Sequence, residues 1–449
     1  MYQDQATARS LEELGRFVAG FEWEQADRGL QEQLVKTLLD TLGVMIAGGR
    51  LPEMRALAAA WAPREGASRL FGMGKTAGVD AAAYLNGVSA VALELDEGNK
   101  YARGHPASHA FPAALALAQE KNASGRELAA GLIVGYETAS RFGRATKLNP
   151  GVHPHGNWGV AGAAAATSRL MGLGPRETAA ALDAAGGLAL ATPFESALVG
   201  NSVRNAWVGA ANASGLVAAR MGAAGIADVT GTPSETLGGI LGTFEPEELT
   251  RDLGRRFDLK SGYFKRHASC SFTHPPADAV LTVLTRNPRL RAEQVSSVLV
   301  ETHGVAAPLN RIECRTRLAA MFSIPYVVAV MIVEGECSPA AFDDAHWGDV
   351  AVRRIMSATR VVAAEEFDRR LPEERGAKVT VTLQDGSTLA SEVPNPVGDA
   401  ANRPFGLAEI REKLDPLLMP VGMDAAGLEG IVRGLLGARN VNEVLENAP

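Results

Sequence analysis

The sequence predicts a protein with a large all-helical part and a smaller mixed α/β part. The first half of the chain reads as one helix after another, separated by glycine, proline, asparagine or serine. Near residue 255 the pattern changes to short segments rich in β-branched residues, and two of these segments flank an Asp-Gly turn signal. A chain of 449 residues can hold more than one hydrophobic core, so two domains are expected.

Apolar periodicity and end signals predict the helices of the first part. Residues 30–46 place leucine or methionine at three- and four-residue spacing, which gives a helix one buried face. Ser124 followed by Glu127 forms a capping box at the start of another helix. Small residues dominate 159–166 and 206–219, which predicts two helices whose axes approach their neighbours closely. The other predicted helices span residues 81–95, 110–121, 125–142, 159–173 and 175–190.

Strand and hairpin signals predict the α/β part. Residues 295–301 form a predicted strand because they are short and rich in β-branched side chains. The alternating runs 378–383 and 387–393 flank Gln384-Asp385-Gly386, which is a strong signal for a β-hairpin. Helices are predicted between these strands, at residues 324–333 and 351–361.

The last part of the chain is predicted to be helical again. Pro394-Asn395-Pro396 indicates a linker, and helices are predicted at residues 407–418 and 425–436. We expect this tail to return to the helical part. The expected domains are an all-helical domain of residues 1–255, completed by the tail 396–449, and an α/β domain of residues 256–395.

The composition describes a soluble globular protein and argues against several classes. With 44 Lys+Arg against 51 Asp+Glu the formal net charge is -7, which disfavours a nucleic-acid-binding protein. No apolar run reaches the length of a membrane span, and the N-terminus has no signal-peptide pattern. Cys270, Cys314 and Cys337 are too few and too scattered for a disulfide framework, which fits a reducing cytoplasm.

Six of the eight histidines fall in three short windows that hold, or lie close to, a lysine or arginine. The windows are residues 100–109, 153–155 and 265–274. A local excess of cationic and titratable groups on an acidic chain predicts a pocket for an anion. The imidazoles would supply acid and base groups that act near neutral pH.

Read in chain order, these windows and their neighbours resemble the MmgE/PrpD family over nearly the whole chain. The matching segments are Leu93-Glu94-Leu95-Asp96-Glu97-Gly98, Gly104-His105-Pro106, Pro112-Ala113-Ala114-Leu115, His153-Pro154 with Gly159, Tyr263-Phe264-Lys265 with Cys270, His274 and Asp278-Ala279, and Phe322-Ser323-Ile324-Pro325-Tyr326. Members of this family include 2-methylcitrate dehydratase, cis-aconitate decarboxylase and iminodisuccinate epimerase. The resemblance implies a large helical domain, a smaller α/β lid domain, an active site in the cleft between them, and a homodimer.

The resemblance also implies which residues form the site. The implied catalytic residues are Asp96, His105, His153, Lys265 and Tyr326. The implied substrate-binding residues are Glu94, Arg103, His155 and Arg204. Neither a metal ion nor a cofactor is expected.

These residue types suit the substrates of the family, which are small polycarboxylates with a proton next to a carboxylate. Removing that proton builds negative charge on an anionic group, so the step needs a base and fixed cations. His105 and His153 are the candidates for base and acid. Lys265 and Arg204 would hold carboxylates, and their charge would keep a nearby imidazole neutral. Asp96 would orient an imidazole, as carboxylates do in catalytic triads.

Two departures from the family pattern bear on the reaction. The decarboxylase and methylcitrate branches place Asp-Thr-Trp or similar residues where this chain has Glu97-Gly98-Asn99. They also carry a lysine where this chain has Arg204, and arginine does not release a proton at working pH.

The expected function is a cofactor-independent lyase that removes a proton α to a carboxylate of a small polycarboxylate. Dehydration of the 2-methylcitrate type is the leading outcome. An epimerase of an iminodisuccinate-type dicarboxylate is the first alternative, and a cis-aconitate-type decarboxylase is the next. From a different class, the chain could be a non-catalytic carboxylate-binding protein. Neither nucleic acid nor a membrane is an expected partner.

Some of these charged residues and histidines could instead lie at the surface without a role in the site. Glu94, Asp96 and Glu97 lie at the end of a predicted helix, and acidic residues at such a place are commonly surface charge. Arg266 and His267 could equally form a solvated turn.

A metal site is a further alternative. His153 and His155 could lie on one side of an extended segment, with Asp96 or Glu97 completing the ligand set. The chain has no HExxH motif and no paired cysteines, so chemistry without a metal is favoured. His109 and His155 are more typical of surface residues, or of residues that support a site, than of catalytic residues.

Overall fold

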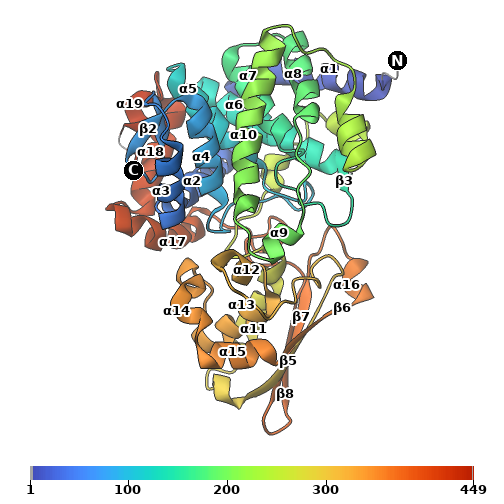
Figure 1. Cartoon of the computed structure of the whole chain (residues 1–449), viewed down its shortest axis with the longest axis vertical. Coiled ribbons are helices and arrows are strands. Elements are labelled where there is room, and N and C mark those ends of the chain that lie inside the picture. Colours follow the sequence, from blue (N-terminus) through green and yellow to red (C-terminus); the bar gives the residue numbers. More distant parts are fainter. Residues whose placement is uncertain (1–3, 447) are drawn as a thin grey trace.

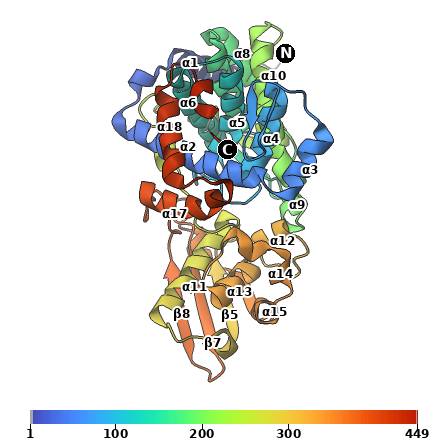
Figure 2. The same cartoon turned by 90° about the vertical axis from the view of Figure 1, so that its left-hand side faces the viewer.

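The computed structural model describes residues 4–446 and 448–449. Within them, helices gather at one end of the molecule, and a four-stranded sheet with its own helices forms the other end (Figure 1). The turned view shows the same division, with the chain crossing between the ends in several places (Figure 2). The protein is therefore helix-rich with a small sheet region.

The helical end is built from long helices that agree with the apolar periodicity. Its principal helices are α1 (Gln5–Gly20), α2 (Arg28–Gly49), α3 (Pro52–Trp61), α4 (Val79–Val91), α5 (Pro106–Glu120), α6 (Gly125–Ala145), α7 (Val160–Met171), α8 (Pro175–Gly187) and α10 (Val203–Ala223). Short elements complete this region, namely β1 (Ser68–Leu70) paired with β2 (Lys75–Ala77), β3 (Thr146–Leu148) paired with β4 (Gly242–Phe244), and α9 (Glu195–Leu198). Helix α6 begins with the predicted capping box of Ser124 and Glu127.

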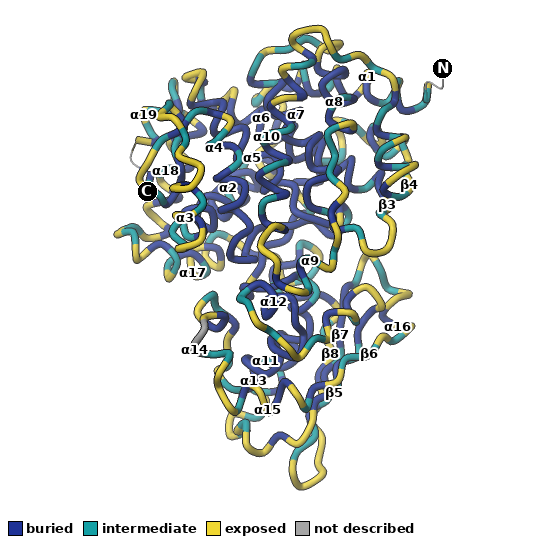
Figure 3. Tube along the Cα trace, in the orientation of Figure 1, coloured by how far each residue is buried: buried dark blue, intermediate teal, exposed yellow. Residues whose placement is uncertain are grey.

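The small residues of α7 and α10 lie where helices cross at short distance, as predicted. A Cβ atom on Gly162 of α7 would lie 2.6 Å from Cβ of Ala139 in α6. A Cβ atom on Gly215 of α10 would lie 2.3 Å from Cβ of Ala163 in α7. Figure 3 shows that the trace through α4, α5, α6, α7 and α10 is mostly buried, so these helices form the centre of the helical end.

The sheet at the other end has the strand order β6-β5-β7-β8. Its strands are β5 (Val295–Thr302), β6 (Thr359–Ala363), β7 (Ala377–Leu383) and β8 (Thr388–Val393). The predicted hairpin is confirmed, because β7 and β8 pair antiparallel and Gly386 takes a φ of 85° in the turn between them. Helices α11 (His274–Arg286), α13 (Ile324–Glu334) and α15 (Val350–Ser357) pack against this sheet. The shorter helices here are α12 (Arg317–Met321), α14 (Asp344–Trp347) and α16 (Glu365–Asp368).

Two predicted elements differ from the structure. The predicted helix 351–361 ends at Ser357, and the following residues form β6 instead. This strand pairs parallel with β5 at the sheet edge, which suits the β-branched Val361 and Val362. Helix α4 ends at Val91 rather than at residue 95, because the chain turns there and Glu94 takes a φ of 51°.

The tail helices lie against the N-terminal part of the chain. Helices α17 (Leu407–Leu418) and α18 (Ala425–Gly437) both pack on α2, and α19 (Asn442–Leu445) follows them. In Figure 1 these red ribbons lie beside the blue ribbon of α2. The tail thus contacts α2, while the division into an all-helical domain completed by the tail and an α/β domain, with boundaries at 255 and 396, stays a prediction. No helix within the described residues is both long and apolar enough to cross a membrane.

The close crossing of α2 and α4 predicts a large effect of one added methyl group. A Cβ atom on Gly48 would lie 2.1 Å from the carbonyl oxygen of Ser89, which is backbone and cannot move aside. We expect Gly48→Ala to lower the free energy of unfolding by roughly 1–3 kcal/mol or more. The matched control is Gly430→Ala in α18, where an added Cβ meets nothing within 4 Å. This control should gain up to about 1 kcal/mol from helix propensity. Urea unfolding of both variants is the measurement. A Gly48→Ala variant as stable as the wild type would contradict the packing argument.

Candidate active site

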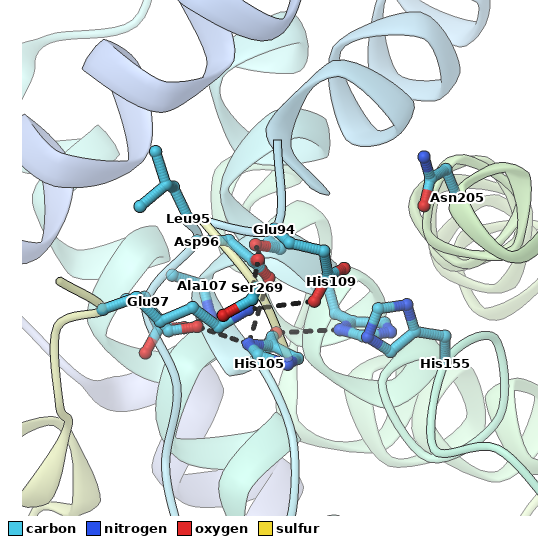
Figure 4. A network of polar contacts seen from close by, with 12 residues as sticks. Glu94, Leu95, Asp96, Glu97, His105, Ala107, His109, His155, Asn205 and Ser269 are labelled. Atoms are coloured by element: carbon cyan, nitrogen blue, oxygen red, sulfur yellow. Dashed lines mark hydrogen bonds and ion pairs between the residues drawn. The ribbon is translucent and has the colours of Figure 1, made fainter. Parts of the chain in front are cut away.

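Three acidic side chains between α4 and α5 are buried in the centre of the molecule. Glu94, Asp96 and Glu97 are each 1% exposed, so the interpretation of these residues as surface charge is wrong. A buried carboxylate needs a cation or hydrogen-bond donors to offset its lost hydration. Figure 4 shows all three turned toward a group of polar side chains that supply such partners.

His105 is held by this acidic segment at one ring nitrogen. It is the residue before α5, whose first residue is Pro106. Its Nδ1 lies 2.6 Å from the carbonyl oxygen of Glu97 and 3.0 Å from Oδ2 of Asp96 (Figure 4). Both partners are acceptors, so Nδ1 carries a proton, and in the tautomer protonated at Nδ1 alone Nε2 is an acceptor.

Two cationic side chains that lie far from this segment in the sequence form ion pairs with Glu94 and Asp96. Nζ of Lys265 lies 3.2 Å from Oε2 of Glu94 and 3.2 Å from Oδ1 of Asp96. Nη1 of Arg204, in the first turn of α10, pairs with Oε1 of Glu94. Lys265 and Arg204 are 0% and 1% exposed, so these ion pairs lie in a water-poor environment where charges interact strongly.

The pKa values within this network follow from burial and charge together. Burial alone would raise the pKa of Asp96, but His105 and Lys265 hold the pKa well below its usual range. Burial alone would lower the pKa of Lys265, but Asp96 and Glu94 raise it above its usual value. Asp96 is thus a carboxylate and Lys265 an ammonium group at neutral pH.

Three further histidines pack beside His105 and stay neutral. The ring centroids of His105 and His155 are 5.3 Å apart, and those of His153 and His155 are 4.5 Å apart. Burial is the main cause that lowers the pKa of His153 and His155 well below the usual value, and the charge of Arg204 adds to it. Burial also lowers the pKa of His109 to about 4. For His153 and His155, burial is thus the larger cause and the charge of Arg204 adds to it in the expected direction.

The hydrogen bonds of these histidines show which ring nitrogens are occupied and which nitrogen carries the proton. His109 has both ring nitrogens in use, with Nδ1 2.8 Å from the carbonyl oxygen of His105 and Nε2 3.5 Å from the amide nitrogen of Gly156. Nε2 of His155 lies 3.4 Å from Nη2 of Arg204, which leaves the proton on Nδ1. That Nδ1 has no hydrogen-bond partner among the described residues. His153 accepts the amide N–H of His155 at Nδ1, so its proton lies on Nε2.

The structure brings together most of the residues that the sequence analysis expected in the site. The residues that meet in one network are Glu94, Asp96, His105, His153, His155, Arg204 and Lys265. The other two lie apart from it. Arg103 is exposed and its Nη1 donates to the carbonyl oxygen of Thr146. Tyr326 is buried, and its hydroxyl donates to the carbonyl oxygen of Ala341 at 2.7 Å.

Glu97 and His267 are two further buried residues with polar partners of their own. Glu97 is held by the amide N–H of Ala107 at 2.6 Å and the hydroxyl of Tyr136 at 3.1 Å, and burial raises its pKa to about 8. His267 is 3% exposed and its Nε2 lies 3.1 Å from Oδ1 of Asp278, so it is not part of a solvated turn. No local sequence signal marks either contact, because burial and tertiary partners create both.

A pocket of about 710 Å³ adjoins the acidic segment. Leu93 and Leu95 line this pocket, whereas Glu94 and Asp96 form ion pairs with Lys265. Alternate residues of the segment therefore face the pocket and the charged network. The remaining lining comes from α2, α13 and α17, among other segments. Among the described residues, no three histidine, cysteine, aspartate or glutamate side chains are grouped as metal ligands would be.

Comparison with known proteins settles the family. The MmgE/PrpD N-terminal domain matches residues 12–246, and the MmgE/PrpD C-terminal domain matches residues 267–434. The chain belongs to the MmgE/PrpD family. It is 30% identical to the cis-aconitate decarboxylase-like protein oryM of Aspergillus oryzae, over 91% of this chain and 90% of that protein.

Other relatives carry related names. The chain is 27% identical to a cis-aconitate decarboxylase of Aspergillus terreus, over 91% of this chain and 89% of that protein. It is 24% identical to the cis-aconitate decarboxylase of Homo sapiens, over 74% of this chain and 71% of that protein. The family and these relatives support an enzyme of the lyase type.

The raised pKa of Glu97 predicts how stability depends on pH. Between its ordinary pKa of 4.5 and about 8, the folded protein keeps a proton that the unfolded chain has lost. The contribution of Glu97 to the free energy of unfolding therefore falls as pH rises through this window. Glu97→Gln removes the titration, so its stability relative to the wild type should rise between pH 5 and pH 8. The exposed Glu293→Gln is the matched control, and urea unfolding at both pH values is the measurement. A stability difference for Glu97→Gln that does not change with pH would contradict a proton on Glu97.

Proposed function

We propose that this MmgE/PrpD protein is a cofactor-independent lyase that acts on a small polycarboxylate by moving a proton at the carbon α to a carboxylate. One observation carries the proposal. His105 donates its Nδ1 proton to Asp96 and to the carbonyl oxygen of Glu97, which orients the ring and leaves Nε2 as a base. The same carboxylate pairs with Lys265, so base and cation are fixed relative to each other.

These groups can carry out dehydration, in which the substrate loses a proton and a hydroxyl group from neighbouring carbons. Nε2 of His105 takes the proton from the α carbon, and the C–H electron pair forms the new C=C bond as the neighbouring C–O bond breaks. The leaving hydroxide needs a proton to depart as water, and protonated His105 can return the proton it took, which restores its neutral form. The neutral rings of His153 and His155 can donate hydrogen bonds to the leaving oxygen from Nε2 and Nδ1. Lys265 and Arg204 offset the negative charge that develops on the carboxylate.

Decarboxylation is the second candidate, and the names of the relatives favour it. Three relatives at 24–30% identity are cis-aconitate decarboxylases or decarboxylase-like proteins. In this reaction the C–C bond to a carboxylate breaks, carbon dioxide leaves, and the electron pair stays on the substrate. Protonated His105 would then deliver a proton to that carbon. Arg204 stands where both the decarboxylase and the methylcitrate branches carry a lysine, so this residue does not decide between the two reactions.

The remaining alternatives differ in the fate of the same proton. An epimerase of an iminodisuccinate-type dicarboxylate would return a proton to the opposite face of the α carbon. A non-catalytic carboxylate-binding protein would keep the cations without turnover. The proposal also includes a homodimer, a cytoplasmic location, and a helical domain and α/β lid domain that meet at the site.

Proton NMR of the protein in D₂O tests the proposal directly. The panel is citrate, methylcitrate, cis-aconitate, iminodisuccinate, malate and tartrate, with the protein treated with a chelator. We expect deuterium at the α position of at least one compound, because Nε2 of His105 exchanges its proton with solvent. The product then separates water loss, loss of carbon dioxide and epimerisation. No exchange and no product with any compound would argue against the lyase and for the binding protein.

Substitution of His105 tests its assigned role. His105→Asn should lower kcat by roughly two orders of magnitude or more, which is the usual scale for a general base, and leave the fold intact. The matched control is His346→Asn, because His346 is partly exposed and pairs with Glu334 outside the network. Steady-state kinetics and circular dichroism of both variants are the measurements. A wild-type rate for His105→Asn would remove His105 from the mechanism.

A further inference from the structure

A buried ion pair lies directly behind the acidic segment, on residues that the proposed mechanism does not use. Lys413 belongs to α17 in the tail of the chain, and Asp40 belongs to α2. Nζ of Lys413 lies 2.5 Å from Oδ1 of Asp40 and 2.7 Å from the carbonyl oxygen of Leu95. The side chains of Lys413 and Asp40 are 5% and 0% exposed.

The carbonyl of Leu95 belongs to the peptide group that enters Asp96. A hydrogen bond to that carbonyl fixes the peptide plane, since the plane is rigid and its atoms move together. The plane in turn sets the direction in which the Asp96 side chain leaves the backbone. Asp96 then contacts Nδ1 of His105 and Nζ of Lys265, so the chain of contacts runs from the tail to the base.

Attachment of the tail alone does not account for this buried lysine. An exposed pair already joins the tail to α2, since Arg433 of α18 pairs with Glu32 of α2 at 3.0 Å. Burial of an ammonium and a carboxylate removes the hydration of both ions at a large cost in free energy, and an apolar pair of similar volume often packs as well or better. Moreover, Oδ2 of Asp40 has no hydrogen-bond partner among the described residues. The contact that an apolar side chain could not replace is the hydrogen bond to Leu95.

We propose that Lys413 is a positioning residue, which holds the Leu95–Asp96 peptide so that Asp96 can orient His105. Lys413 touches no reacting atom in this arrangement and acts only through Leu95 and Asp96. Asp40 pairs with the amino group of Lys413 and holds it directed at the carbonyl. The tail of the chain thereby becomes part of the active-site framework, although α17 contributes no group to the reaction.

The test compares Lys413→Met with Lys413→Arg and with the control Arg433→Met. Lys413→Met keeps the length and apolar stem but cannot donate, Lys413→Arg can donate, and Arg433→Met loosens the tail at the exposed pair. The first readout is the Nδ1–H signal of His105 in protein labelled with ¹⁵N-histidine, assigned by its loss in His105→Asn. We expect this signal to shift or broaden in Lys413→Met, and to stay at the wild-type position in Arg433→Met.

The second readout is kinetic and rests on the proposed function. Lys413→Met should lower kcat by about tenfold to a hundredfold, the scale of a misplaced catalytic group. KM should change by less than about threefold, because Arg204 and Lys265 still hold the substrate. Lys413→Arg should recover most of the rate, and Arg433→Met should keep it.

The outcomes separate the two proposals. A wild-type His105 signal in folded Lys413→Met would overturn the positioning role, whatever the kinetics. If the wild type turns over no compound, the lyase proposal fails and the signal alone decides the role of Lys413. Should Lys413→Met not fold, Lys413→Gln replaces it, since its shorter amide can donate to Asp40 while Leu95 loses its donor. An unchanged His105 signal in that variant would equally overturn the proposal.

Discussion

The pairing of Glu94 and Asp96 with Arg204 and Lys265 is the interaction on which the site depends. Each of these four side chains is nearly inaccessible to water, and none of them could be buried alone at an acceptable free energy. Two carboxylates and two cations balance each other within the cluster. Because the partners come from the segment before α5, from α10 and from the start of the α/β part, the pairing also ties together distant parts of the chain.

Burial has a second consequence, which is the neutrality of the histidines. An imidazole in water gains a proton near pH 6.5, but His153 and His155 are surrounded by protein and face Arg204. A neutral imidazole can accept a proton, whereas an imidazolium cannot, so these two rings keep an acceptor nitrogen near neutral pH. Burial and the charge of Arg204 act in the same direction on them.

Local features were predictable from the sequence, and long-range features were not. The hairpin at Asp385-Gly386 and the capping box of Ser124 and Glu127 each depend on residues a few positions apart, and both are present. The network depends on partners far apart in the chain, since Lys265 lies 171 residues after Glu94. Family resemblance, rather than periodicity or spacing, indicated that these positions belong together.

Residues outside the resemblance show the limit most clearly. Lys413 lies 318 residues after Leu95, and a lysine in an amphipathic helix such as α17 ordinarily indicates a solvated face. His267 follows Arg266, and the two residues together indicated a solvated turn. In both cases the packing of another element over the side chain, which no local pattern records, decides the burial.

Arg204 contacts three polar side chains of the site at once, through two nitrogens of its guanidinium group. Its Nη1 pairs with Glu94 and donates to Oδ1 of Asn205 at 3.1 Å, while Nη2 faces Nε2 of His155. A planar guanidinium can serve these directions at once, whereas a lysine ammonium is a single point of charge. A guanidinium also keeps its protons at any working pH, so Arg204 can bind and orient but cannot act as an acid. Proton transfer therefore falls to the imidazoles, and the tautomers set by Asp96, Arg204 and the backbone decide which nitrogen gives and which receives.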